Sequence, residues 1–202
     1  MDIETQAAAW TEIRERFTGW VETPNGPGST LEATQNTRRE LPALLTRHNI
    51  RKLLDAPCGD WNWLSKTVLP KGLSYIGWDI DETFIARNKE EYGKRGRKFE
   101  NANLLTVEAI PEVDAVMCRD FLIHLPNENI LALLEKFRAG AKYLIATHSP
   151  GKGNARPCPE EGHDGRPGYW CHRTDLEAEP FGLTKIDGFT EYRHSELALF
   201  EL

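Results

Sequence analysis

The chain has 202 residues, a formal net charge of −6, and 40% hydrophobic and 28% charged residues. This length favours a single compact body that buries a full core without disulfides or structural metals. No apolar run approaches the roughly 18 residues needed to cross a bilayer, so no membrane partner is expected. The acidic balance makes nucleic acid a less suitable partner than a small molecule.

The first residues, Met1-Asp2-Ile3-Glu4, are acidic and precede no apolar signal core. We therefore expect a cytoplasmic protein. The cysteines are widely spaced, and two of them fall at the ends of predicted strands, where a reduced thiol packs as a small hydrophobic group. The sequence predicts no disulfide framework.

The N-terminal part of the chain predicts two helices. Apolar side chains recur every three or four positions over residues 2–18, which is typical of an amphipathic helix. A Pro- and Gly-rich turn over 24–28 follows, and a second helix is expected over about 30–48, with Ser29 or Thr30 as its N-cap. The turn is either a lid over a binding site or a plain connection between helices.

From residue 49 onward, strand and helix signals alternate. Helices are expected near 61–67, 82–93 and 127–139, and strands at 52–56, 74–78, 98–101, 115–118, 143–147, 183–189 and 196–202. This order predicts an α/β fold with a doubly wound parallel sheet. We divide the chain into an N-terminal helical extension or lid (1–48) and a main domain (49–202). An irregular segment, 149–172, interrupts the pattern.

The most informative segment is Lys52-Leu53-Leu54-Asp55-Ala56-Pro57-Cys58-Gly59-Asp60-Trp61-Asn62-Trp63, which precedes Tyr75-Ile76-Gly77-Trp78-Asp79. An apolar strand runs into a glycine turn and a helix, and a carboxylate closes the next strand. This pattern is typical of a nucleotide-cofactor pocket, in which that carboxylate binds a ribose. The spacing suits both dinucleotides and S-adenosylmethionine.

The neighbours of Gly59 favour one of these cofactors. A dinucleotide site requires three glycines, whereas this turn has one, with Asp60 and Trp61 where small neutral residues are needed. A carboxylate at Asp60 repels a pyrophosphate but attracts a cationic sulfonium. We therefore predict S-adenosylmethionine as cofactor. A nicotinamide-dependent oxidoreductase and a non-catalytic binding protein are the alternatives.

From about residue 50 onward the chain resembles the class I S-adenosylmethionine-dependent methyltransferases. The resemblance rests on the first motif at 53–60, on Asp79, and on the segment 113–126. Gly28-Ser29-Thr30, the DAPCGDWNW motif and Cys118-Arg119-Asp120 are similar to a bacterial and phage subfamily without an assigned substrate. Pro57 and Trp61 depart from the general family pattern, which has glycines there.

The resemblance implies a Rossmann-like seven-stranded sheet with an antiparallel terminal strand. It also implies a set of cofactor-binding residues, namely Asp55, Ala56, Gly59, Asp60, Trp61, Asp79, Ile80, Asn103, Leu104 and Arg119. Asp79 matches the acid that holds the ribose hydroxyls. Asn103 stands where an adenine-contacting acid is common, and its side-chain amide can still hydrogen-bond an adenine edge.

Methyl transfer needs alignment and, where the nucleophile carries a proton, a base. Asp120, His124 and His148 follow the fourth and fifth predicted strands and are the catalytic candidates. Each also has a possible structural role, as a cap, an ion-pair partner or a donor to backbone carbonyls. The acceptor stays open between a small molecule, a saccharide and a modified base, and the oligomeric state is not predicted.

Two further clusters have competing interpretations. Cys158, His163, Cys171 and His172 offer zinc-ligand chemistry, but their spacing is unfamiliar and adjacent Cys171 and His172 strain joint ligation. We expect a polar surface loop and no bound metal. Basic residues over 87–98 indicate a solvated helix end, and a polyanion-binding patch is the alternative.

Overall fold

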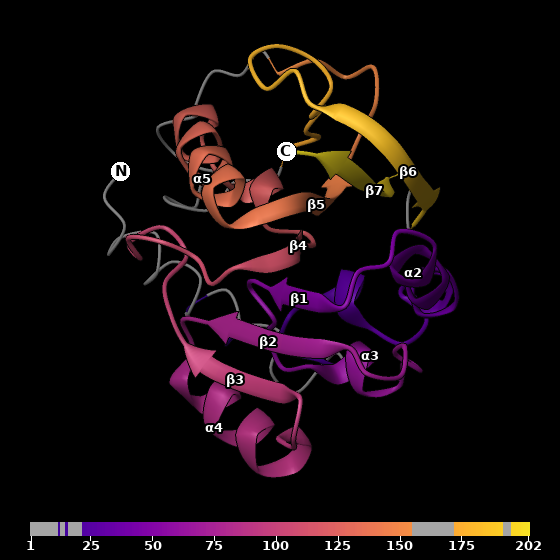
Figure 1. Cartoon of the computed structure of the whole chain (residues 1–202), viewed down its shortest axis with the longest axis vertical. Coiled ribbons are helices and arrows are strands. Elements are labelled where there is room, and N and C mark those ends of the chain that lie inside the picture. The colour runs from indigo at the N-terminus through magenta and orange to yellow at the C-terminus, as the bar shows by residue number, and fades with distance from the viewer. Residues whose placement is uncertain (1–11, 13–14, 16–21, 155–171, 192–194) are drawn as a thin grey trace.

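The computed structural model describes residues 12, 15, 22–154, 172–191 and 195–202. The fold is built on one seven-stranded sheet in the order β3-β2-β1-β4-β5-β7-β6 (Figure 1). The strands are β1 (Lys52–Asp55), β2 (Ser74–Asp79), β3 (Arg97–Asn101), β4 (Val113–Cys118), β5 (Ala141–His148), β6 (Thr184–Thr190) and β7 (Glu196–Glu201). β1 to β5 are parallel, whereas β7 runs antiparallel to β5 and β6. The predicted doubly wound sheet with an antiparallel terminal strand is confirmed.

The described helices agree with the sequence pattern except near the N-terminus. They are η1 (Pro27–Ser29), α2 (Gln35–Arg47), α3 (Asn62–Ser65), α4 (Glu82–Tyr92), η2 (Leu122–His124) and α5 (Asn127–Gly140). Of the helix predicted over 2–18, only residues 12 and 15 are described, and both are helical. None of the described helices is long and apolar enough to cross a membrane.

The start of α2 corrects one prediction. Thr30 accepts a hydrogen bond from the Ala33 N–H, as an N-cap would, but the helix begins five residues later. The intervening residues form turns, and the Leu31 N–H donates to the carboxylate of Glu22. This contact with a segment outside the helix competes with regular helix geometry, and single-sequence capping rules do not include it.

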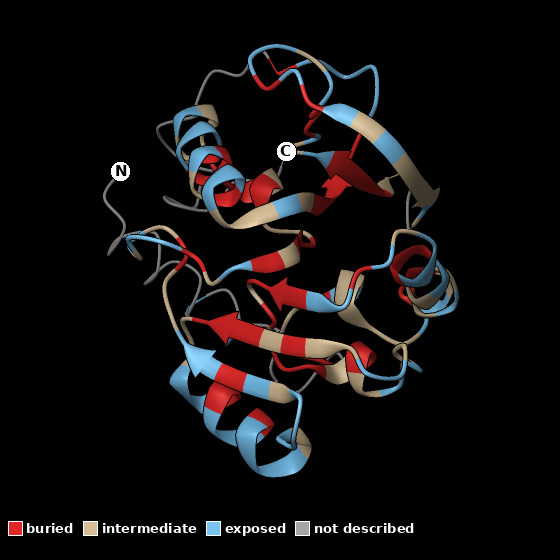
Figure 2. Ribbon diagram, viewed as in Figure 1, coloured by how far each residue is buried: buried red, intermediate tan, exposed pale blue. Residues whose placement is uncertain are grey.

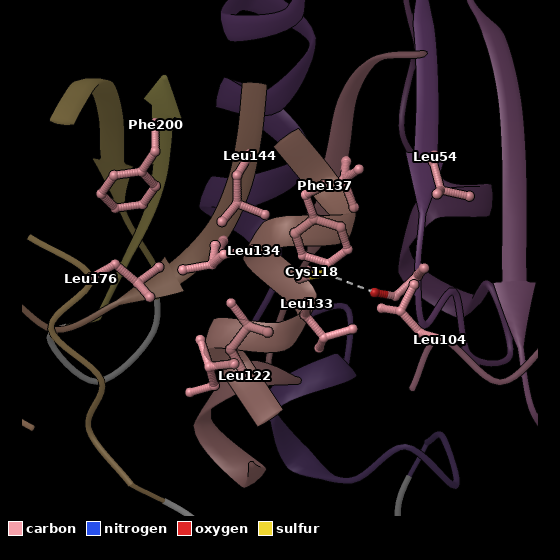
Figure 3. Close-up of a cluster of buried hydrophobic side chains, with 14 of the residues drawn as sticks. Leu54, Leu104, Cys118, Leu122, Leu133, Leu134, Phe137, Leu144, Leu176 and Phe200 are labelled. Atoms are coloured by element: carbon pink, nitrogen blue, oxygen red, sulfur yellow. Dashed lines mark hydrogen bonds between the residues drawn. The ribbon is translucent and has the colours of Figure 1, made fainter. Parts of the chain in front are cut away.

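Two apolar layers cover the sheet, one on each face. On one face α2, α3 and α4 pack against alternate strand residues such as Leu53 and Met117. On the other face α5 packs against the intervening residues, and Figure 3 shows Phe137, Leu133 and Leu134 of α5 near Leu144. The central strands are buried on both faces and are apolar almost throughout, as parallel strands usually are (Figure 2).

The carboxyl ends of β1, β2 and β4 meet at one edge of the sheet, where ligands bind in doubly wound folds. The segment 22–30, which we call the strap, reaches this edge from the N-terminal side. It is joined by hydrogen bonds to the turn after β1 and to the residue after β4. The fold therefore brings the Pro- and Gly-rich turn of the sequence to the predicted cofactor edge.

Candidate functional site

The β1 turn holds the carboxylate that closes β2. The Gly59 N–H donates to Asp79 Oδ2 at 2.8 Å, and the Asp81 N–H donates to Oδ1 at 2.9 Å. The side-chain amide of Asn101 also donates to the carbonyl oxygens of Asp79 and Ile80. Asp79 is only 4% exposed. Its carboxylate has a fixed position at the end of β2, and carboxylate oxygens are suitable acceptors for a vicinal diol.

Gly59 adopts the left-handed conformation, with a φ of 56°. A Cβ at this position would lie 2.6 Å from Asn25 Nδ2 of the strap, which is closer than unbonded atoms approach. Glycine is therefore required here both by the backbone conformation and by the close approach of another segment. From the sequence, this glycine is expected to make room for a ligand. In the structure, the Asn25 side chain fills the space beside it.

Asp55 belongs to a buried chain of hydrogen bonds. Tyr75 donates its hydroxyl to Asp55 Oδ2 at 2.6 Å, and the Trp61 indole N–H donates to the Tyr75 oxygen at 2.8 Å. The pKa of Asp55 is raised to about 7. Burial is the largest cause, the nearby Asp79 charge acts in the same direction, and the Tyr75 hydrogen bond opposes both. Trp61 packs edge-on against Phe99 and belongs to the apolar layer of α2, α3 and α4.

Asp60 turns its carboxylate to the strap. Thr23 Oγ1 donates to Oδ2 at 2.7 Å, Asn25 Nδ2 donates to Oδ1 at 2.6 Å, and the Asn62 N–H donates to Oδ1 at 3.2 Å. The Asp60 carbonyl oxygen also accepts a hydrogen bond from Arg87. These contacts give Asp60 a role in anchoring the strap that the sequence does not indicate.

Arg119, the first residue after β4, is fully engaged within the protein. Its Nε donates to Glu191 Oε1 at 2.8 Å, its Nη2 donates to the Gly28 carbonyl oxygen at 2.8 Å, and its Nη1 lies 3.1 Å from Asp120 Oδ2. Burial by itself lowers the pKa of Arg119, but the charges of Asp120 and Glu191 raise it above its ordinary value. The structure thus commits this guanidinium to the strap and to two carboxylates.

Asp120 stands at the edge with its side chain 35% exposed. Its N–H donates to Thr147 Oγ1 at 2.7 Å, and the Thr147 hydroxyl lies 3.0 Å from Asp120 Oδ1. Its φ of 51° is unusual for a residue other than glycine, and such conformations cluster at functional sites. Asp120 therefore combines a fixed carboxylate with access to solvent.

The two histidine candidates are both buried. His148 is 0% exposed, and its Nδ1 accepts a hydrogen bond from the Leu176 N–H at 3.2 Å. Its Nε2 consequently carries the proton and donates to Glu177 Oε2 at 3.2 Å. Both ring nitrogens hold the segment after the irregular loop, which is the geometry of a structural histidine. His124 lies in η2 and is buried beside the β4 edge.

Possible metal ligands in the described part of the chain come together once. Ligand atoms of His148, Asp175 and Glu177 lie within 4.8 Å of one another. However, the carboxylate of Asp175 already accepts backbone N–H groups from Gly151, Glu177 and Ala178. Of the four residues whose zinc-ligand chemistry the sequence analysis considered, Cys158, His163 and Cys171 lie outside the described residues. The His172 N–H donates to the Ile123 carbonyl oxygen.

The remaining predicted cofactor residues lie after β1 and β3. The side-chain oxygen of Asn103 accepts a hydrogen bond from the Leu105 N–H at 3.0 Å, so this amide also closes a turn. Leu104 and Ala56 are buried in the α5 layer. Thr147 and Glu191 also contact the residues that follow β4, and the sequence analysis did not identify them. Thr147 directly precedes a predicted candidate, whereas Glu191 gives no local signal.

Neither a protein-family model nor a curated protein matches the sequence. Solved structures do match. The complex of DhpI with SAH has a TM-score of 0.65 and 13% identity, with 100% of this chain and 98% of that chain covered. Magnesium protoporphyrin IX methyltransferase (ChlM) from Synechocystis PCC 6803 with bound SAM has a TM-score of 0.59 and 16% identity, with 96% of each chain covered.

The methyltransferase domain of bacterial CtHen1 has a TM-score of 0.59 and 18% identity, with 84% of this chain and 100% of that chain covered. At these identities the likeness concerns the fold. It agrees with the strand order and with the antiparallel β7. The chain therefore has the fold of the class I S-adenosylmethionine-dependent methyltransferases.

Proposed function

We propose that the chain is an S-adenosylmethionine-dependent methyltransferase whose acceptor is a small molecule or a saccharide. The observation that carries this proposal is the Asp79 carboxylate, buried at the end of β2 and held by the Gly59 and Asp81 N–H groups. Carboxylate oxygens are the acceptors that the two ribose hydroxyls require. The likeness of fold to ChlM with bound SAM supports the same assignment.

The other groups of the edge fit this cofactor in chemical type. Ile80, half-buried directly after β2, offers apolar surface for an adenine, and the Asn103 amide nitrogen offers a donor. The bound cofactor supplies an electrophilic methyl group on a sulfonium, so the leaving group needs no acid. What the protein must add is alignment and a proton acceptor.

Asp120 is our proposed proton acceptor. Its carboxylate is fixed by Thr147 and Arg119, and it is still accessible from the edge. His148 is left out because both of its ring nitrogens are engaged by the protein. An acceptor with a hydroxyl or amine within reach of Asp120 would lose its proton to this carboxylate as the methyl group is transferred.

The two alternative functions make different predictions. An oxidoreductase requires a turn that admits a pyrophosphate, whereas here Asp60 stands in the turn and Asn25 fills the space beside Gly59. A non-catalytic binding protein would bind the cofactor without turnover. Supplying methyl-labelled cofactor with a metabolite extract separates this case from the enzyme, because only the enzyme transfers the label.

Calorimetry with S-adenosylmethionine and S-adenosylhomocysteine tests the cofactor assignment. We expect the wild type to bind both and Asp79→Ala to bind at least about tenfold more weakly, because two hydrogen bonds to a charged group are lost. Asp114→Asn is the matched control, since Asp114 also accepts two backbone N–H groups but lies at the opposite edge of the sheet. No heat and no thermal shift with the wild type at millimolar ligand would refute the function.

A further inference from the structure

The strap is joined to the cofactor edge at two separate places. Asp60, in the turn after β1, accepts hydrogen bonds from Thr23 and Asn25. Arg119, after β4, donates to the carbonyl oxygen of Gly28. The segment 22–30 thus spans from one strand end to the other, across the place where β1 and β4 lie side by side.

The surfaces of the strap and the edge are fitted to each other through two glycines. A Cβ at Gly59 would meet the Asn25 side chain at 2.6 to 3.2 Å, and a Cβ at Gly28 would meet Asp120 Oδ2 at 3.2 Å. At both positions, therefore, the absence of a side chain allows the two segments to touch. Close approach at both ends indicates that the strap has a defined position against the residues that follow β1 and β4.

The turn that seats the strap is also the turn that fixes Asp79. Gly59 donates its N–H to Asp79 and lies directly against Asn25, and the next residue is the anchor Asp60. A change in how the strap is seated must therefore act on the backbone that orients the Asp79 carboxylate. The anchor Asp60 is one residue along the chain from Gly59, whose N–H holds the Asp79 carboxylate.

We propose that Asp60 is a positioning residue that sets cofactor affinity through the strap and not through its own charge. The proposal rests on the proposed function and specifies how one of its residues acts. It replaces the electrostatic role that the sequence indicates for Asp60, in which the carboxylate attracts a sulfonium. The contacts of Asp60 favour the strap, because its Oδ2 accepts from Thr23 and its Oδ1 accepts from Asn25.

Thr23→Val is the sharpest test of this proposal. Thr23 is 0% exposed, so it offers no surface to a ligand, and valine preserves its shape and the Asp60 charge. The variant removes the hydroxyl that donates to Asp60 and accepts from the Asn25 N–H, so both of its hydrogen bonds lie within the strap and its anchor. We expect it to weaken binding of S-adenosylmethionine and S-adenosylhomocysteine equally, by about threefold to tenfold, since the net contribution of a typical hydrogen bond is of that size.

Asp60→Asn and the double variant Thr23→Val/Asp60→Asn complete the test. If both residues act through the same contact, the double variant binds no more weakly than Asp60→Asn alone, because coupled residues are non-additive. Hydrogen exchange over 22–30 should also rise in each single variant. Asp114→Asn should change neither cofactor affinity nor exchange in the strap, and thermal melting checks that every variant is folded.

Three results would overturn the proposal. One is unchanged affinity in Thr23→Val. Another is additive effects in the double variant. The third is a loss in Asp60→Asn that is several times larger for the sulfonium than for S-adenosylhomocysteine, since only a direct charge effect distinguishes the two ligands. If the wild type bound neither ligand, the proposed function would fail with it, whereas wild-type binding with unaffected variants would reject the strap proposal alone.

Discussion

At the scale of single residues, carboxylates at the cofactor edge differ in what surrounds them. Asp79 accepts two backbone N–H groups, Asp60 accepts from the strap, and Asp55 has a tyrosine hydroxyl in an otherwise apolar setting. Burial without a cationic partner in direct contact is costly for an ionised carboxylate. Protonation of Asp55 near neutral pH is consequently expected to affect the protein.

The raised pKa of Asp55, about 7 against 3.8, predicts a specific dependence of stability on pH. A raised folded-state pKa stabilises the fold below the unfolded value, and this stabilisation is lost as pH rises through about 7. Asp55→Asn removes the titration and keeps an oxygen that accepts from Tyr75. Relative to this variant, the wild type should lose up to about 4 kcal/mol of unfolding free energy between pH 4 and pH 8.

Urea unfolding of both proteins across that pH range measures the difference. Comparing the two proteins cancels the titration of all other groups. A difference that stays constant with pH would mean that Asp55 titrates normally in the folded protein. Asp114→Asn serves as a control for the loss of a carboxylate elsewhere in the sheet.

At the scale of elements, α2 and β6 are joined by polar and charged side chains that lie far apart in the sequence. Asp187 Oδ2 accepts hydrogen bonds from Arg47 at 2.9 and 3.1 Å and lies 2.8 Å from His48 Nε2. Desolvation by itself raises the pKa of Asp187, but the hydrogen bonds from His48 and Arg47 lower it to about 2. These contacts connect the C-terminal end of α2 to β6, the outermost strand on one side of the sheet.

This lowered pKa predicts a loss of stability in acid. The contribution is present above the unfolded value near 3.8 and disappears as pH falls through about 2. Because Arg47 is half exposed, solvent screening reduces the effect, and we expect Asp187→Asn to lose about 1 to 2 kcal/mol at pH 7. The loss should vanish near pH 2, as thermal melting at both pH values would reveal. Equal losses at both pH values would contradict the ionic origin.

At the scale of the whole molecule, the sheet and most helices could be predicted because their signals are local. The apolar run of β4 and the period of α5 are each readable within one segment. The strap contacts were not predictable in this way. Thr23 and Asp60 are 37 positions apart, and Arg119 and Glu191 are 72 apart, so only the folded chain brings them together. The proposed role of Asp60 depends on such a contact. This is why the role expected from the sequence differs from the one proposed from the structure.

The α5 layer is the place where the stability of the whole fold can be tested. Phe137 is fully buried among residues from β4, β5 and β7, and α5 is the only described α-helix that contributes side chains to that layer. Phe137→Ala should cost about 3 to 5 kcal/mol of unfolding free energy, since it leaves a cavity in the packed layer. Leu131→Ala, on the same helix but 38% exposed, is the matched control and should change stability by less than about 0.5 kcal/mol.

Because the layer spans the strands that carry the cofactor edge, the Phe137→Ala loss should appear as one cooperative transition. Tryptophan fluorescence should report the packing of Trp61 and Trp63 on the opposite face and of Trp78 in the layer of Phe137, and circular dichroism should report the helices and the sheet. Coincident urea midpoints, shifted together in Phe137→Ala, are expected for a single folding unit. If the fluorescence midpoint stayed at its wild-type value while the dichroism midpoint fell, the protein would not unfold as a single cooperative unit.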